Sequence, residues 1–319
     1  MTRGGSHGHG HGHGHGHGHG HGGPGQDRRR LAGALAVTAV VLVAEAVGAW
    51  LSGSLALLAD AGHVLTDVAG LVIALIAASL AARPASARRT WGYRRAEVLA
   101  ATLQAAALLA VGVFVLVEGV RRLLDPPEVA SGAMVVFGVV GLVGNVVALL
   151  LLLRGDGGRS INVRAAVLEV VNDGLGSVAV IVAAVVIALT GWTRADAVVS
   201  LLIGVLIVPR TLGLLRETTS VLLEETPPGL DLEDVRRHLL ELPHVQAVHD
   251  LHASRITSGL PVLSAHVVLD DSCFSDGHAP EILDQLQACV AEHFPVAVEH
   301  ATFQLEPQGH GGHEVATHD

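Results

Sequence analysis

Long apolar blocks alternate with short Arg-bearing loops over the first two thirds of the chain, and this pattern predicts membrane-spanning helices. An apolar stretch of about 20 residues is long enough to cross the hydrocarbon core of a bilayer as a helix. Blocks of this length stand at residues 31–51, 54–82, 98–120, 132–153, 163–189 and 195–215. We therefore expect a polytopic α-helical membrane protein with six transmembrane helices.

The pattern changes after the last apolar block, where residues 217–307 have the periodicities of a soluble α+β domain. An apolar period of the helical kind covers residues 231–242 and 279–294, and strand-like runs cover 245–254, 262–269 and 299–305. The order α-β-β-α-β predicts a small two-layer domain of about 90 residues, near the low end of what folds alone. The chain then divides into a tail (1–29), a membrane domain (30–216), a soluble domain (217–307) and a second tail (308–319).

The N-terminal tail is a Gly-His repeat, which we expect to be disordered. Glycine at every second position keeps the backbone flexible, so the imidazoles are free to bind metal ions weakly. A purification tag and a native metal-collecting tail both remain open. The shorter C-terminal tail, also expected to be disordered, carries three further histidines. The repeat histidines are His7, His9, His11, His13, His15, His17, His19 and His21.

Composition and charge narrow the class of protein further. Hydrophobic residues make up 50% of the chain and charged residues 16%, and the formal net charge is −10. A nucleic-acid partner would require an exposed basic face, and the only basic clusters flank the predicted spans. We therefore expect membrane lipid, and no nucleic acid, around this chain.

The arginines predict how the chain is oriented in the membrane. Eleven arginines lie before the first span or in the loops after the second and fourth spans, and three lie in the alternate loops. Because loops rich in basic residues stay in the cytoplasm, we expect a multi-pass protein of the cell membrane with both termini cytoplasmic. The two sets are Arg28, Arg29, Arg30, Arg83, Arg88, Arg89, Arg94, Arg95, Arg154, Arg159 and Arg164 against Arg121, Arg122 and Arg194.

Two couplets of ionisable residues interrupt the predicted spans. His63 and Asp67 stand in the second, and Glu169 and Asp173 stand in the fifth. In a helix, residues four apart lie on one face, one turn apart. An ionisable residue at the bilayer centre costs roughly 2.5 to 3.5 kcal/mol on insertion scales, so four of them require a partner. A divalent cation, alternating with protons, suits one imidazole and three carboxylates.

Three further polar residues lie in the predicted spans. Asp60 stands three residues before His63, and Glu45 and Asn145 stand in the first and fourth spans. These residues are candidates for supporting the ion ligands or for helix packing, and packing is the favoured interpretation. A purely structural polar network remains the alternative for all of the polar residues in the spans.

Four stretches of the sequence resemble the cation diffusion facilitator family of zinc and related-metal exporters. Residues 52–67 (SGSLALLADAGHVLTD) are similar to the family's second-span signature, and residues 162–177 (NVRAAVLEVVNDGLGS) are similar to its fifth-span signature. The loop 91–97 (WGYRRAE) and the segment 248–252 (VHDLH) also match. The resemblance covers roughly residues 30–307 and implies a six-helix transporter domain followed by a cytoplasmic ferredoxin-like domain, working as a homodimer.

The resemblance also implies a transport site for Zn²⁺ made of His63, Asp67, Glu169 and Asp173. Glu169 departs from the family, because the zinc-selective pattern most often has His at this position. One His with three carboxylates is still a reasonable zinc site. The additional oxygen ligand makes the site harder, so Mn²⁺, Fe²⁺, Co²⁺ or Cd²⁺ remains open as the main substrate.

A second metal site is implied in the cytoplasmic domain. His249, His266, His278 and Glu306 fall at positions where family members bind additional metal, with a regulatory role. One expected His is replaced by Gln304. No organic cofactor is expected at either site.

The charge of the transport site predicts how it could work. Three carboxylates crowded in a low-dielectric setting favour protonation of the empty site, and a dication would displace those protons. The ligands could therefore run metal/proton antiport near the membrane midplane. A passive metal channel remains open, since ligands alone do not reveal coupling. An intramembrane metalloprotease is excluded, because His63 is followed by Val64 and Leu65 and no HExxH motif is formed. We expect no enzyme activity.

Overall fold

Six long helices form the first part of the structure, a computed structural model that describes residues 24–153 and 161–310. All six are long and apolar enough to cross a membrane. The predicted number and positions of the spans are therefore confirmed within the described ranges. Their bounds are α1 Pro24–Ser52, α2 Leu55–Ala81, α3 Ala96–Leu124, α4 Ser131–Leu153, α5 Ile161–Thr190 and α6 Arg194–Leu222.

Two of these helices extend seven residues beyond one end of the apolar blocks that predicted them. Helix α1 begins at Pro24, so residues 24–29 are helical instead of belonging to a disordered tail. Helix α6 continues to Leu222, seven residues beyond the predicted end at 215. A helix does not require an apolar sequence, so it can extend beyond the membrane into water as long as no helix-breaking residue ends it. The Gly-His repeat and residues 311–319 lie outside the described residues.

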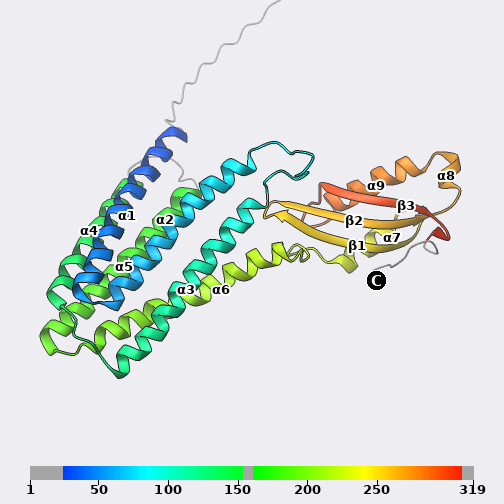
Figure 1. Cartoon of the computed structure of the whole chain (residues 1–319). Helices are drawn as coiled ribbons and strands as arrows, with labels where there is room; N and C mark the ends of the chain where they lie inside the picture. Colours follow the sequence, from blue (N-terminus) through cyan, green and yellow to red (C-terminus); the bar gives the residue numbers. More distant parts are fainter. Residues whose placement is uncertain (1–23, 154–160, 311–319) are drawn as a thin grey trace, which may run out of the picture.

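The helices pack as a bundle in which α3 lies along α6, and α4 lies between α1 and α5 (Figure 1). Glycines permit the close approach of α3 and α6. A Cβ atom on Gly119 would stand 2.9 Å from Cδ2 of Leu201, and one on Gly204 would stand 2.8 Å from Cδ2 of Leu116. Small residues are common at helix contacts in membranes. Because lipid tails are as apolar as the side chains, helices associate there through close packing and not through the hydrophobic effect.

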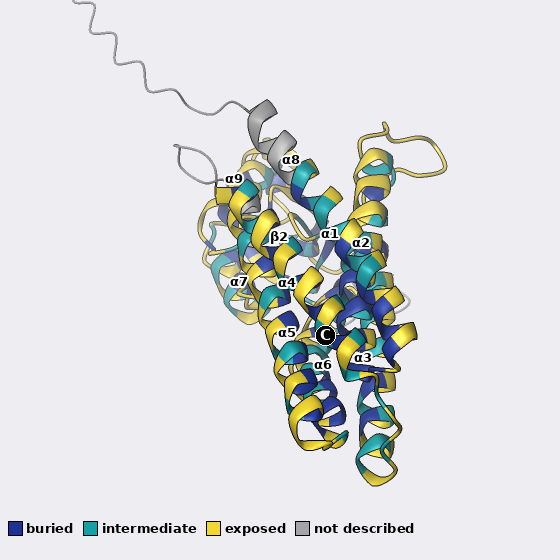
Figure 2. Cartoon of the chain, turned by 90° about the vertical axis from the view of Figure 1, so that its left-hand side faces the viewer, coloured by how far each residue is buried: buried dark blue, intermediate teal, exposed yellow. Residues whose placement is uncertain are grey.

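The outer faces of the bundle are apolar and exposed (Figure 2). Trp50 is 85% exposed, Leu189 is 80% exposed and Leu206 is 67% exposed. Such a surface would be a large aggregation-prone patch in water. Lipid is the medium that suits it, so the exposure pattern agrees with a membrane domain.

A small α+β domain follows the bundle. Its three-stranded sheet has the order β1-β2-β3, with β1 antiparallel to β2 and β2 parallel to β3. The predicted order of helices and strands is confirmed, and one short helix, α8, was not predicted. The order corresponds to a ferredoxin-like domain without its first strand. The bounds are α7 Leu232–Leu240, β1 Val245–Thr257, β2 Leu260–Leu269, α8 Cys273–Asp276, α9 Ala279–Glu292 and β3 His300–Pro307.

The core of this C-terminal domain lies between the sheet and helices α7 and α9. Val235 and Leu239 of α7, Leu286 of α9 and Val267 of β2 are fully buried within it. Because side chains alternate across a strand, the neighbours of Val267 point to the other face of the sheet. That second face carries His266, the residue before Val267.

Two contacts join the C-terminal domain region to the loop between α2 and α3. Arg95 forms a 2.7 Å ion pair with Glu224, just after α6. The ring of Trp91 meets the ring of His300 edge to face, with centroids 4.7 Å apart. The loop that continues from α2 therefore touches the first residue of β3.

Candidate functional site

The two couplets predicted from the sequence lie near the middle of their helices. His63 and Asp67 are one turn apart on α2, with Nε2 of His63 3.4 Å from Oδ2 of Asp67. Glu169 and Asp173 are one turn apart on α5. The helical spacing therefore places both members of each couplet on one helix face, as the sequence predicted.

These four residues line one cavity of about 680 Å³. The cavity, called here the intramembrane cavity, lies between α2, α3, α5 and α6. Its polar lining residues are Asp60, His63, Asp67, Gln104, Glu169, Asn172, Asp173, Arg210 and Thr211, and its remaining lining is apolar. Polar groups that converge in a mainly apolar cavity are the usual form of a small-ligand site.

The cavity brings the side chains from α2 and α5 into direct relation. Asp67 and Glu169 interact across it, and Asp173 lies within electrostatic reach of both. Nδ1 of His63 and Oδ1 of Asp173 are buried and have no hydrogen-bond partner among the described residues. Such atoms are open positions for a ligand. An imidazole nitrogen and carboxylate oxygens form the donor set of a Zn²⁺-type dication.

The three supporting candidates lie against this cavity. Asp60 is 5% exposed and lines it, while Glu45 and Asn145 are 1% and 4% exposed and lie behind it. Nδ2 of Asn145 donates a 3.4 Å hydrogen bond to Oγ of Ser177. Glu45, Asp60 and Asp173 lie within electrostatic reach of one another. The candidates therefore form a buried polar cluster next to the couplets.

Two glycines make room for this buried cluster. A Cβ atom on Gly141 of α4 would stand 2.6 Å from Oε1 of Glu45. One on Gly176 of α5 would stand 2.9 Å from Oδ1 of Asp60. Any larger residue at these positions would push a carboxyl group out of place.

Arg210 and Gln104 line the cavity and were not predicted from the sequence. Arg210 stands inside the apolar stretch of α6, and Gln104 stands inside that of α3. The signal for Arg210 was present, because a charged residue within a span calls for the same explanation as the couplets. Gln104 had a weaker signal, and its side chain occupies the space that a Cβ on Gly70 would fill.

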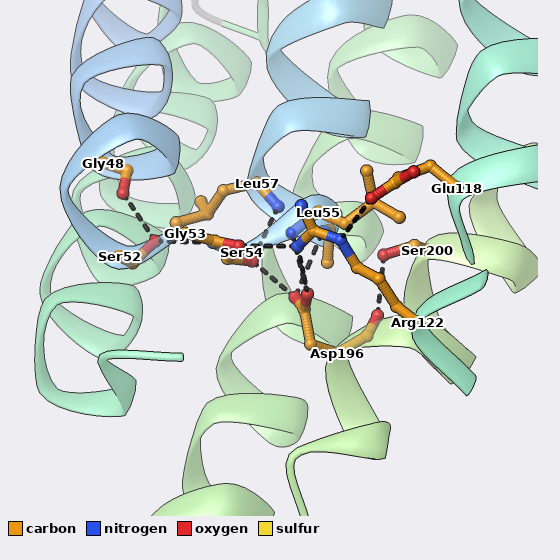
Figure 3. Close-up of polar contacts among 11 residues, drawn as sticks. Gly48, Ser52, Gly53, Ser54, Leu55, Leu57, Glu118, Arg122, Asp196 and Ser200 are labelled. Carbon is orange, nitrogen blue, oxygen red and sulfur yellow. Dashed lines mark hydrogen bonds and ion pairs between the residues drawn. The ribbon is translucent and has the colours of Figure 1, made fainter. Parts of the chain in front are cut away.

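A separate polar network, the Asp196 network, lies where α2 and α6 begin (Figure 3), at the end of the bundle away from the C-terminal domain (Figure 1). Oδ1 of Asp196 accepts hydrogen bonds from Oγ of Ser54 at 2.5 Å and from the backbone N–H of Ala56 at 3.1 Å. Oδ2 accepts one from the N–H of Leu55 at 2.7 Å. Nη1 of Arg122 lies 3.8 Å from Oδ2. The first turn of α6 therefore caps the N-terminus of α2 and contacts α3.

Three of the predicted C-terminal ligands form a compact group on the sheet face away from α7 and α9. His249 and His266 are paired across β1 and β2. Nε2 of His249 lies 3.3 Å from Oε2 of Glu306, and Nδ1 of His266 lies 2.8 Å from Oε1. One ligand atom from each of the three residues lies within 4.8 Å of the others, which suits one metal ion. We call this group the β-sheet triad.

Two neighbouring side chains contact the β-sheet triad. Gln304, at the position where the family resemblance implied a His, donates a 2.8 Å hydrogen bond to Oε1 of Glu306. Asp250 lies 3.6 Å from Nε2 of His266 and was not predicted. Asp250 has φ 49° at an irregularity in β1, so the strand bends there and turns this carboxylate toward the triad.

The fourth predicted ligand, His278, is placed elsewhere. It precedes α9, where its Nδ1 lies 2.9 Å from Oδ2 of Asp276 and its ring stacks on that of His244. The hydrogen bond with Asp276 and the charge of that carboxylate raise the pKa of His278 above its ordinary value. Within the described residues, His278 is not part of the β-sheet triad.

Comparisons with known proteins agree with this architecture. The family model of the cation efflux transmembrane domain matches residues 31–223, and that of the cation efflux protein cytoplasmic domain matches residues 227–308. The chain is 42% identical over 280 residues to the cation efflux system protein CzcD of Alcaligenes sp. (strain CT14), covering 88% of this chain and 87% of that protein.

Two further relatives cover nearly the same part of the chain. The zinc transporter ZitB of Escherichia coli (strain K12) is 40% identical over 281 residues, covering 88% of each protein. The cadmium, cobalt and zinc/H(+)-K(+) antiporter of Bacillus subtilis (strain 168) is 37% identical over 270 residues, covering 84% of this chain and 86% of that protein. With its six apolar helices and its two matched domains, the chain belongs to the cation efflux (cation diffusion facilitator) family and is a multi-pass membrane transporter for the efflux of divalent metal cations, not an enzyme.

Proposed function

We propose that this transporter exports Zn²⁺ from the cytoplasm in exchange for protons, with His63, Asp67, Glu169 and Asp173 as the ligands of the transported ion. One observation carries the proposal: these four side chains, from two different helices, line the same cavity in the membrane domain. Two of the relatives carry zinc in their names.

The donor set supports zinc and defines its competitors. Zn²⁺ accepts one imidazole nitrogen and carboxylate oxygens in a tetrahedral site. Glu169 supplies an oxygen where a nitrogen would favour softer ions, so discrimination against harder or larger dications should be weak. The name of the Bacillus subtilis relative includes cadmium and cobalt as well as zinc. We expect Cd²⁺ and Co²⁺ to compete with Zn²⁺ here.

The crowding of carboxylates supports proton exchange. Without a cation, it costs free energy to keep three carboxylates ionised together in an apolar cavity, and this applies to Asp67, Glu169 and Asp173. Protons entering from outside would fill the empty site, and a dication from the cytoplasm would replace them. Alternating exposure of one site to the two sides of the membrane then couples the two movements.

The same proposal includes an orientation and an assembly. The arginine distribution supports a position in the plasma membrane with both termini in the cytoplasm. The C-terminal domain then meets cytoplasmic metal, and the β-sheet triad would bind a regulatory ion there. The C-terminal domain is small, and α7 and α9 cover only one face of its sheet. Because a small domain buries little surface alone, both features support a homodimer.

Transport into proteoliposomes tests the coupling. The purified protein is reconstituted, a pH gradient of either sign is imposed, and the entry of Zn²⁺ is followed with an internal metal-sensitive dye. Antiport predicts Zn²⁺ accumulation against its own gradient when the interior is acidic, together with alkalinisation of the interior. Zn²⁺ flux that only follows the Zn²⁺ gradient and ignores pH would instead identify a passive channel.

A further inference from the structure

The charge of the intramembrane cavity is not carried by the four ion ligands alone. Arg210 of α6 lines the same cavity, and its guanidinium lies within electrostatic reach of all four ligands. Among the described residues, no carboxylate oxygen lies within 4.0 Å of a guanidinium nitrogen of Arg210, the limit for an ion pair. Arg210 therefore acts on the site through space, as a fixed cation, because its guanidinium does not lose its proton in proteins.

The charges of the four ligands and of a bound dication balance only when Arg210 is counted. Asp67, Glu169 and Asp173 contribute three negative charges when they bind a metal, and a neutral His63 contributes none. With a dication bound, one negative charge remains, and the positive charge of Arg210 offsets it. A net charge in a low-dielectric cavity is costly, so this balance favours a doubly charged cargo. The extra negative charge belongs to Glu169, the residue that stands where the family's zinc pattern most often has a neutral His.

We propose that Arg210 is a specificity-determining residue of the transport site, whose fixed positive charge offsets Glu169 and balances the charge that the four ligands and a bound dication leave over. This inference rests on the proposed transport site. Its consequence is a bound metal that is held more weakly than three carboxylates alone would hold it. Weak holding suits a transporter, because an ion that binds too tightly leaves too slowly.

The chain offers a matched control on the same helix. Arg216 lies six residues after Arg210 and is exposed as Arg210 is, but it is absent from the lining of the cavity. Both residues are arginines of α6, so Arg216→Gln removes the same charge from the same helix away from the ligands. Neutral side chains at position 210 should also insert well, because removing a charge from a span lowers the cost of membrane insertion.

The experiment measures Zn²⁺ binding to the purified full-length protein in detergent and Zn²⁺ transport in proteoliposomes at one fixed pH. Binding by the Asp173→Ala variant is subtracted, so that sites in the tail and the C-terminal domain cancel. We expect Arg210→Gln and Arg210→Met to lower the dissociation constant at least about tenfold. We also expect KM and kcat to fall together, because the metal binds tighter and leaves more slowly. Arg210→Lys and Arg216→Gln should behave like the parent.

A double variant separates charge balance from a structural effect. Glu169→Gln removes the charge that Arg210 offsets, so Arg210→Gln combined with Glu169→Gln should move the dissociation constant back toward that of the parent. Parent-like or weaker binding in folded Arg210→Gln and Arg210→Met protein would overturn the inference, as would an equal effect of Arg210→Lys. If Asp173→Ala removes no Zn²⁺ binding from the parent, the transport site itself is misplaced, which is a different failure.

Discussion

Asp196 of α6 accepts a 2.5 Å hydrogen bond from the hydroxyl of Ser54, the residue that caps the N-terminus of α2. The two residues stand 142 positions apart in the sequence. The same carboxylate accepts from two backbone N–H groups of the first turn of α2 (Figure 3). Helix α2, which carries His63 and Asp67, is thereby fixed to α6, which carries Arg210.

The Asp196 network should therefore be a stability element of the membrane domain. Asp196→Ala would leave three donors unsatisfied, two of them backbone groups, and would remove one of the partners of Arg122. Breaking a buried charged network of this kind costs about 3 to 5 kcal/mol. We expect a clearly lower unfolding temperature in detergent. Asp125→Ala, which removes an exposed carboxylate at the same end of the bundle, serves as control, and equal unfolding temperatures of the two variants would contradict this role.

His278 should titrate above its reference range. Its pKa is raised by the hydrogen bond and the charge of Asp276. The charged His278 thus adds stability below the unfolded pKa of about 6.5, and this contribution is lost as the pH rises through the folded pKa. Titration of labelled histidine by NMR in the full-length protein measures the shift. Asp276→Asn should return the pKa toward its ordinary value, while Asp284→Asn should leave it raised.

Glu169→His tests the residue that departs from the family pattern. The change adds a nitrogen ligand and removes one negative charge, so Zn²⁺ transport should persist while transport of the harder Mn²⁺ falls relative to it. The pH profile of exchange should move as well, because an imidazole replaces a carboxylate. A metal series in proteoliposomes at several pH values measures both. A variant with the parent's metal ranking and pH profile would show that Glu169 does not face the ion.

Deleting residues His7 to His21 should change transport modestly and leave metal selectivity intact. A tract with glycine at every second position is too flexible to preorganise one strong site. Export rates of the deletion variant at matched expression provide the measurement. Complete loss of export would show that the tail is an essential part of the pathway.

The sequence was most informative where the chemistry is local to one helix. His63 and Asp67, and Glu169 and Asp173, stand four residues apart, and helix geometry alone places each pair on one face. The meeting of the two pairs in one cavity is a property of how α2 and α5 pack. The sequence predicted it because four ionisable residues in the spans require a shared partner, and through a family resemblance.

The sequence was least informative where contacts join distant segments. Nothing near Asp196 marks Ser54 as its partner, because that contact depends on the positions of two helix ends. Arg210 was overlooked because arginines were counted in loops and not in spans. The family resemblance grouped His278 with His249. In the structure, His278 follows α8 and contacts Asp276 instead. Local helix rules say nothing about such loops.

The rate of Zn²⁺ transport in the Asp173→Ala variant tests the central claim most directly, that the four residues of the intramembrane cavity carry the transported ion. The variant is compared with His249→Gln, which weakens the β-sheet triad and leaves the cavity intact. Initial Zn²⁺ uptake under an imposed pH gradient is measured in proteoliposomes containing equal amounts of folded protein. The account predicts loss of at least about 99% of the transport rate for Asp173→Ala, which corresponds to roughly 2.7 kcal/mol, and substantial transport for His249→Gln. Transport by Asp173→Ala at the parent's rate would contradict it.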